Sequence, residues 1–268
     1  MSKYLRYALL SSTVLGMGVA YSVTASAQTV TLSSAPNGNI SNPSGNNYSI
    51  ISNKLNFFTD TFPAIVVDTD ANLTVPVGMF VDGGGGAAIQ YDYIDAGSDA
   101  VFNLNSGGQV NAGSNGSGTD LAAIRSATGL DINSLTLNLD GAIQTLGLTR
   151  AVGLSEGTID RVDLFITGNA NISRSGGSSV DFDLRNANAN GVHVTVSGAP
   201  TFASPASFTA LNGNDTFTFN DTGATAYGSI LGNGGADQIF INTDTISFSG
   251  AVNLGTTTGD NIIYDAAG

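Results

Sequence analysis

The sequence predicts an all-β protein, specifically a parallel, right-handed β-solenoid with an irregular N-terminal cap. Three observations favour this fold class: short segments of alternating apolar residues, Gly/Asn/Ser-rich turns between them, and a nearly constant repeat period. Such repetition is typical of solenoids, in which units that cannot bury an apolar face alone stack on their neighbours. An antiparallel β-sandwich, the main alternative, also has short strands and regular turns, but it does not require a fixed period.

The segment 1–27 is typical of a secretory signal peptide. Two basic residues precede an apolar stretch, and the sequence A-S-A that ends at Ala27 has the small-residue pattern of a cleavage site. We therefore expect the mature protein to begin at Gln28. The alternative is a membrane anchor, but the apolar stretch is short for a span and is interrupted by Ser and Thr.

The composition limits the classes of function. The chain has 8 basic and 21 acidic residues and a formal net charge of −13. This balance argues against nucleic-acid binding, which depends on Lys and Arg meeting phosphates, and against electrostatic attachment to an anionic membrane. Because the chain contains no Cys, we expect a large core or bound ions, rather than disulfides, to stabilise the secreted protein.

Residues 28–86 are less regular than the rest of the chain. They open with TVTLSS at 29–34, a stretch rich in Gly, Asn, Pro and Ser follows at 35–47, and short apolar segments come around 55–58, 65–67 and 73–81. The first coil of a solenoid must be covered, because an open sheet edge templates aggregation. We therefore assign this region to an N-terminal cap.

Solenoid repeats are expected over residues 87–268. The apolar residues Ile124, Val152, Val180 and Phe208 follow one another at intervals of 28. We predict that these four side chains point inward at equivalent positions of successive coils.

A second set of strands lies between these apolar residues. Segments of alternating polarity that end in Gly occur at 135–141, 163–168 and 192–198. An earlier copy is expected at 87–92 and 100–108, with a spacing of 35 to the next copy. No segment between the strands is long enough for the crossover helix of a βαβ unit.

The period shortens towards the C-terminus. Asp215, Asp237 and Asp260 follow one another at intervals of 22 and then 23, and the apolar residues after each Asp keep the same steps. We predict that the period changes near Leu211 and that Asp215 and Asp237 occupy matching corners of adjacent coils. The longer second interval is expected to displace Asp260.

Over residues 87–268 the sequence resembles the passenger regions of bacterial autotransporters, which are long right-handed β-helices rich in Gly, Asn and Thr. The resemblance rests on repeat units such as DLAAIRSATGLDINSLTLNLDGAIQTLG and the run LNGNDTFTFNDTGATAYGSILGNGGADQIFI, together with the signal peptide and the lack of Cys. It implies a secreted or cell-surface protein, associated with the outer membrane, with a non-enzymatic role in structural display or adhesion. The implied partners are surface proteins or glycans of a host or the environment.

The same resemblance implies an outer-membrane β-barrel, which this sequence does not contain. Such barrels are built from tilted strands of about ten residues with aromatic girdles. The barrel is expected on a continuation beyond Gly268, on a separate polypeptide, or not at all if export follows another route. The coil-like residues that lead up to Gly268 favour a continuation.

Residues 232–240, GNGGADQIF, resemble the RTX calcium repeat G-G-x-G-x-D-x-U-x, with Asn at the second position. The copy around Asp215 matches only in part, and the copy at Asp260 loses the glycine register. RTX repeats follow one another about every nine residues, whereas these lie 22 and 23 apart. The resemblance implies Asp237 and Asp215 as candidate calcium ligands; the alternative is that these Asp residues only form turns.

Other candidate sites are weak. The D-T-D sequence at 68–70 begins like an EF-hand loop, but Leu73 and Met79 replace the Gly and Glu that such a loop requires, so we expect a turn. His193 is the only histidine and lies in the alternating sequence VHVTV. We expect its side chain to point outward into solvent.

A carbohydrate-active enzyme on a β-helix is the second class of function considered. Such enzymes use pairs of carboxylates. Asp92, Asp95 and Asp99 form the densest acidic cluster, and strand alternation would place Asp181 and Asp183 on one face. Basic partners are sparse, and we expect these carboxylates to be solvated and the protein not to be an enzyme.

Overall fold

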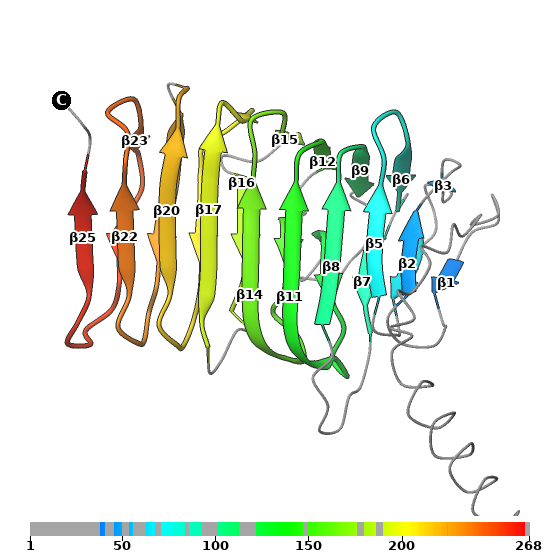
Figure 1. Cartoon of the computed structure of the whole chain (residues 1–268), viewed down its shortest axis with the longest axis horizontal. Helices are drawn as coiled ribbons and strands as arrows, with labels where there is room; N and C mark the ends of the chain where they lie inside the picture. Colours follow the sequence, from blue (N-terminus) through cyan, green and yellow to red (C-terminus); the bar gives the residue numbers. More distant parts are fainter. Residues whose placement is uncertain are drawn as a thin grey trace, which may run out of the picture.

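The computed structural model describes residues 38–40, 46–49, 54–55, 63–67, 71–83, 86–92, 101–112, 122–146, 150–175, 180–185, 190–223 and 225–265. All regular structure in these ranges is β, and the strands stack in sequence order along one elongated axis (Figure 1). The signal segment, residues 1–27, and the 68–70 segment lie outside the described residues. Among the described residues, no helix is long and apolar enough to cross a membrane.

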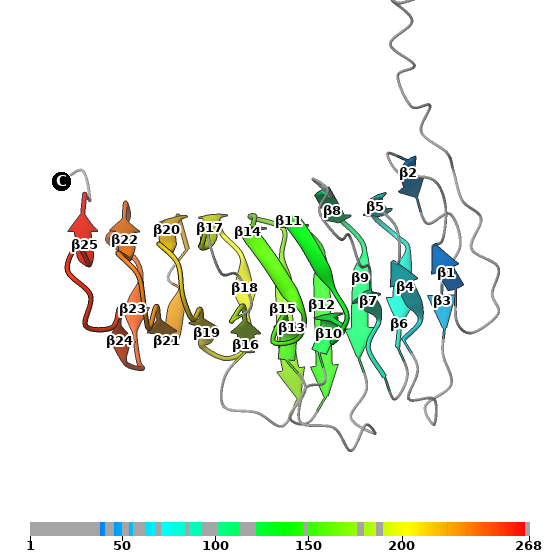
Figure 2. The same ribbon diagram turned by 90° about the horizontal axis from the view of Figure 1, so that it is seen from below.

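Within the described residues, to which the strand counts below refer, the strands form three parallel sheets, which we name sheets A, B and C (Figures 1 and 2). Sheet A has ten strands: β1 (Gly38–Ile40), β4 (Ile65–Val67), β7 (Ile89–Tyr91), β10 (Ala122–Ser126), β13 (Arg150–Gly153), β16 (Val180–Asp183), β19 (Ala206–Thr209), β21 (Ala226–Leu231), β23 (Ser247–Phe248) and β24 (Val252–Asn253), the last paired with β21. Sheet B has nine strands: β2 (Asn46–Ser49), β5 (Ala71–Val75), β8 (Val101–Ser106), β11 (Asp131–Leu139), β14 (Thr158–Ile166), β17 (Val192–Gly198), β20 (Thr216–Asp221), β22 (Gln238–Ile241) and β25 (Asn261–Tyr264). Sheet C has six strands: β3 (Lys54–Leu55), β6 (Phe80–Asp82), β9 (Gln109–Ala112), β12 (Ala142–Leu146), β15 (Asn171–Ser175) and β18 (Thr201–Phe202).

Neighbouring strands in each sheet come from successive coils, so the chain is a parallel β-solenoid, as predicted. For example, β11 pairs in parallel with β8 on the preceding coil and with β14 on the following coil. The coil pattern also extends upstream of residue 87, because β1, β2 and β3 pair with β4, β5 and β6 in the same three sheets. Stacked coils therefore reach into the region that the sequence assigned to an irregular cap.

The register within sheet A corrects one prediction. Ile124 pairs with Val152, but Val152 pairs with Phe182, and Phe182 pairs with Phe208. Val180 is buried and lies two positions before Phe182 on the same face, opposite Ala206. The successive steps in residue number are therefore 28, 30 and 26, rather than three equal steps.

Ring stacking accounts for this register. The rings of Phe182 and Phe208 lie 4.8 Å apart between centroids and are nearly parallel, at 17°. Both side chains are fully buried, and an aromatic pair adds stabilisation beyond its area of burial. The alternation of apolar residues does not show which of two inward residues in a strand pairs with a given residue on the neighbouring coil. The stacking of specific side chains does.

The predicted second strands and the earlier copy are confirmed. β11, β14 and β17 pair in order through inward residues such as Leu137, Leu164 and Val194. Ile89 on β7 pairs with Ile124, which is the expected step of 35 in residue number.

The predicted shortening of the period near Leu211 is also confirmed, and sheet C explains it. Val162 pairs with Val192, a step of 30 in residue number, whereas Val194 pairs with Phe217, a step of 23. In the described part of the chain, β18 is the last strand of sheet C, and the coils that follow contain strands of sheets A and B only. A coil without a strand in sheet C needs fewer residues, so the repeat period is shorter after β18.

Aromatic side chains fill the core of these two-sided coils. The Tyr227 ring lies 6.1 Å from the ring of Phe202 on the last sheet C strand and 5.8 Å from that of Phe248 on the next coil. Phe219 packs 4.5 Å from Tyr227 across the core. Large rings thus occupy the interior where the third strand is missing.

Candidate functional site

Asp215 and Asp237 lie at matching corners of adjacent coils, as predicted. Each directly precedes a strand of sheet B, and the residues that follow them, Thr216 and Gln238, are paired. The backbone N–H of Asp215 donates to Asp237 Oδ1 over 2.9 Å, and Asp215 Oδ1 accepts from the backbone N–H of Val192 over 2.7 Å. Each carboxyl group therefore ties its own coil to the preceding one.

Asp260 continues this ladder, so its predicted displacement is wrong. Asp260 Oδ1 accepts a hydrogen bond of 3.0 Å from the backbone N–H of Asp237, and Asn261 pairs with Gln238. The extra residue is accommodated upstream, in a turn where Gly255 and Gly259 have positive φ angles of 102° and 116°. Glycine adopts this backbone conformation without steric cost.

The two inner carboxyl groups of the ladder are fully buried. Asp215 and Asp237 have 0% exposure, and their Oδ2 atoms have no hydrogen-bond partner among the described residues. Burial, opposed by the hydrogen bond from Val192 and assisted by the charge of Asp237, raises the pKa of Asp215 to about 8. Burial also raises the pKa of Asp237, because a carboxylate loses its hydration there.

Gly232 makes space for the second oxygen of Asp237. A Cβ atom on Gly232 would lie 2.1 Å from Asp237 Oδ2, a distance that no side chain can occupy. The turn continues through Asn233 and Gly235, with φ angles of 69° and 127°. The glycines that resemble the RTX repeat thus admit a buried carboxyl group and form the turn in front of it.

Calcium binding at Asp237 and Asp215 stays a prediction. Calcium takes about six to eight oxygen ligands. In the described part of the chain, no three side chains of the types Asp, Glu, His and Cys gather to hold an ion. Asp215 and Asp237 each present one buried Oδ2, while each Oδ1 already accepts a backbone N–H.

A further buried acid was not found by sequence reasoning. Asp221, the last residue of β20, has 0% exposure. Burial raises the pKa of its carboxyl group, while the nearby hydroxyl groups of Thr225 and Tyr227 favour the charged form. Its sequence neighbours resemble those of any other turn, so only the folded chain marks this position.

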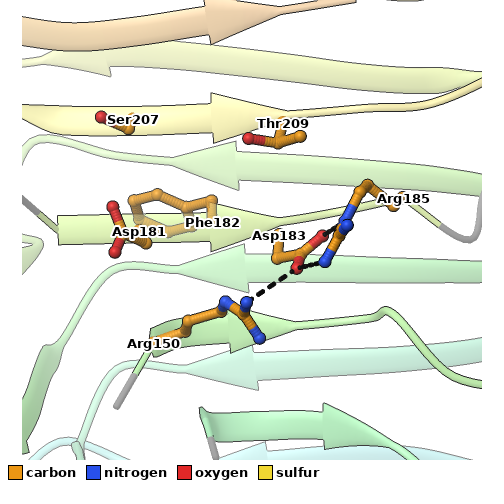
Figure 3. A pocket seen from close by; sticks show the side chains of 7 residues that line it. All are labelled: Arg150, Asp181, Phe182, Asp183, Arg185, Ser207 and Thr209. Atoms are coloured by element: carbon orange, nitrogen blue, oxygen red, sulfur yellow. Dashed lines mark hydrogen bonds and ion pairs between the residues drawn. The ribbon is translucent and has the colours of Figure 1, made fainter. Parts of the chain in front are cut away.

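A second candidate site is a pocket of about 270 Å³ on the outer face of sheet A (Figure 3). It spans three successive coils, and its polar lining residues are Arg150, Asp181, Asp183, Arg185, Ser207 and Thr209. Asp181 and Asp183 share this face, as strand alternation predicted, while Phe182 between them points into the core.

Two guanidinium groups hold Asp183. Arg185 binds it through two hydrogen bonds of 2.7 Å, and Arg150 Nη2 lies 3.4 Å from Asp183 Oδ2. Arg174 holds the neighbouring Asp181 at 2.6 Å. Sequence reasoning missed this convergence of three of the chain's six arginines, because they lie far apart in the sequence, on two coils and in different sheets.

This geometry does not favour the two carboxylates as a catalytic pair. A glycosidase needs one carboxyl group that carries a proton, whereas Asp181 and Asp183 both accept hydrogen bonds from arginine. Asp92 is exposed just after β7, and Asp95 and Asp99 lie outside the described residues.

His193 points outward between the buried Val192 and Val194, as predicted, but it is only partly exposed. Its Nε2 lies 3.2 Å from the carbonyl oxygen of Asn190. Asp163 is its neighbour on the preceding coil, but that carboxylate is bound by Arg161 at 2.8 Å through both oxygens. The described contacts therefore do not join His193 to Asp163 as a catalytic dyad.

Comparison with known proteins gives no relative for this chain: no family model, no curated protein and no solved structure matches it.

Proposed function

We propose that this protein is a secreted or cell-surface β-solenoid that acts in structural display or adhesion, without catalysis. The observation that carries the proposal is the stack of parallel coils, which forms sheets of up to ten strands along one axis (Figure 1). Such a stack presents the same kind of outward residue on coil after coil, and repeated lateral surfaces suit contact with partners.

Sheet B illustrates this lateral surface. Asn138 donates to the amide oxygen of Asn105 one coil earlier over 2.9 Å, and Asn242 donates to Asn220 over 2.6 Å. These side chains lie on the outside, and their hydrogen bonds run along the stack. These parts of the outer face are thus ordered and polar, which supports a role in contact rather than in enclosing a substrate.

The surface location can be tested by labelling with a membrane-impermeant maleimide. The chain has no Cys, so single-cysteine variants are labelled without background. Leu211→Cys places the thiol at a residue with 40% exposure, and Val194→Cys is the matched control with 1% exposure. We expect Leu211→Cys to be labelled on intact producing cells or in their medium, and Val194→Cys only after denaturation. Labelling of Leu211→Cys only after cell lysis would refute the proposed location.

Adhesion is tested with the same producing cells. Cells with and without the gene are compared for attachment to surfaces coated with glycans or matrix proteins, and oligosaccharide turnover is measured in parallel. The proposal expects gene-dependent attachment without turnover. Gene-dependent turnover would favour the enzyme alternative.

A further inference from the structure

We propose that the pocket formed by Arg150, Asp181, Asp183, Arg185, Ser207 and Thr209 binds an acidic sugar, specifically a hexuronate residue of a polysaccharide. This inference deepens the proposed adhesive function and rests on it for its biological setting. Its physical basis is the local charge, the mixture of polar groups and the position on the lateral face (Figure 3).

The local charge is opposite in sign to that of the chain. The lining contributes two positive charges, Arg150 and Arg185, and the two negative charges of Asp181 and Asp183; among the described residues, Arg174 adds a third positive charge beside Asp181 from outside the lining. The region therefore carries an excess of positive charge in a protein of formal net charge −13. An anionic group is attracted to this pocket, while the remaining acidic surface repels it.

The arginines are held in place and reach solvent. Asp183, whose side chain is only 6% exposed, anchors Arg185 and Arg150, whose side chains are 43% and 23% exposed. A guanidinium group fixed by a buried carboxylate loses less side-chain entropy when it binds a ligand. Arg185 donates to Asp183 through Nε and Nη2, and the exposed part of its planar guanidinium group, which has five N–H donors in all, is where a ligand carboxylate meets it.

The rest of the lining suits the hydroxyl groups of a sugar. Asp181, 35% exposed, provides carboxylate oxygens that accept from hydroxyl groups, and Thr209 contributes a hydroxyl group on the next strand. Ser207 lies opposite Asp181 and accepts the backbone N–H of Ser229 over 3.1 Å. At about 270 Å³ the pocket lies just below the range of about 300–1,000 Å³ for ligand pockets, which favours one sugar unit rather than a large ligand.

The test uses calorimetric titration of the full chain with a linear trimer of galacturonic acid and with the neutral galactose trimer. We expect saturable binding of the acidic trimer alone, weakened by added salt. Arg185→Gln should weaken binding about ten- to a hundredfold, because it removes a charged hydrogen-bonding partner. The matched control is Arg161→Gln, which removes another arginine bound to an Asp, on sheet B, and should leave binding unchanged.

A second variant keeps the test valid if Arg185→Gln fails to fold. Thr209→Phe fills the pocket from the outer face of β19 and leaves the arginines in place; it should also abolish binding. The inference is overturned by an absence of saturable binding, by equal binding of the neutral trimer, or by equal losses in the Arg161 and Arg185 variants. Gene-dependent cell attachment in the absence of acidic-trimer binding would overturn this inference and leave the proposed function standing.

Discussion

The backbone N–H of Asp215 donates a hydrogen bond of 2.9 Å to Oδ1 of Asp237, which lies one coil further along the chain. The same arrangement joins Val192 to Asp215 and Asp237 to Asp260. Three carboxyl groups, of which those of Asp215 and Asp237 are buried, therefore connect four successive coils at one corner of the solenoid. Because the two central groups are shielded from water, their protonation is coupled to the stability of the fold.

The contribution of Asp215 to the free energy of unfolding should increase as the pH is lowered from about 9 towards 4. The folded-state pKa of Asp215, about 8, lies above its unfolded value of 3.8, so between these values the folded chain holds a proton that the unfolded chain releases. This contribution is complete below the unfolded pKa and is lost as the pH rises through the folded pKa, with a slope of at most about 1.4 kcal/mol per pH unit.

The measurement is urea unfolding at several pH values, compared between the natural chain and Asp215→Asn. The difference in unfolding free energy between the two proteins isolates the contribution of Asp215. Ion pairs elsewhere respond to pH in the opposite sense, but they are present in both proteins. Asp131→Asn, at an exposed residue of β11, is the control and should keep the pH dependence of the natural chain. A difference that does not change with pH would contradict the buried, protonated state of Asp215.

Calcium removal distinguishes a protonated ladder from an ion site. If protons neutralise Asp215 and Asp237, the melting temperature at neutral pH should be the same in millimolar calcium and in EDTA. A ligand that binds only the folded state would instead raise the melting temperature with concentration. A calcium-dependent rise that disappears in Asp237→Asn would support the RTX-like prediction and refute protonation as the explanation.

Gly232→Ala should destabilise the protein by about 1–3 kcal/mol, as expected for overpacking of a buried site. The added Cβ would lie 2.1 Å from Asp237 Oδ2 and force the carboxyl group or the turn to move. Gly223→Ala is the matched control, because its nearest contact would be 3.6 Å, an ordinary van der Waals distance. Equal unfolding free energies for the two variants would show that Asp237 does not occupy the space beside Gly232.

Phe208→Ala should cost about 3–5 kcal/mol in unfolding free energy, because it leaves a cavity in the core. Phe208 is fully buried, stacks on Phe182 at 4.8 Å and contacts the ring of Tyr227 at 6.3 Å. Phe240→Ala on β22 is the control, since Phe240 faces outward between the buried Ile239 and Ile241 and should cost about 1 kcal/mol or less. Equal losses of unfolding free energy for Phe208→Ala and Phe240→Ala in chemical denaturation would contradict the placement of Phe208 in the core.

The sequence alone determined the fold class, most strand positions and the corner shared by Asp215 and Asp237. Each of these follows from local alternation and from a repeat period, which together require that similar segments stack. The shorter period after Leu211 was also visible in the sequence. Its cause, the loss of sheet C, was not, because strands such as β18 are only two residues long.

The tertiary structure decided the register and the outer pocket. Val180 and Phe182 both point inward, so alternation permits either to follow Val152, and the ring of Phe208 selects Phe182. Asp260 keeps its corner because its turn absorbs the extra residue, which a count along the sequence cannot reveal. Arg150 and Asp183 meet because β13 and β16 are neighbours in sheet A, and a contact between side chains on adjacent coils depends on how the whole coil closes rather than on any local pattern.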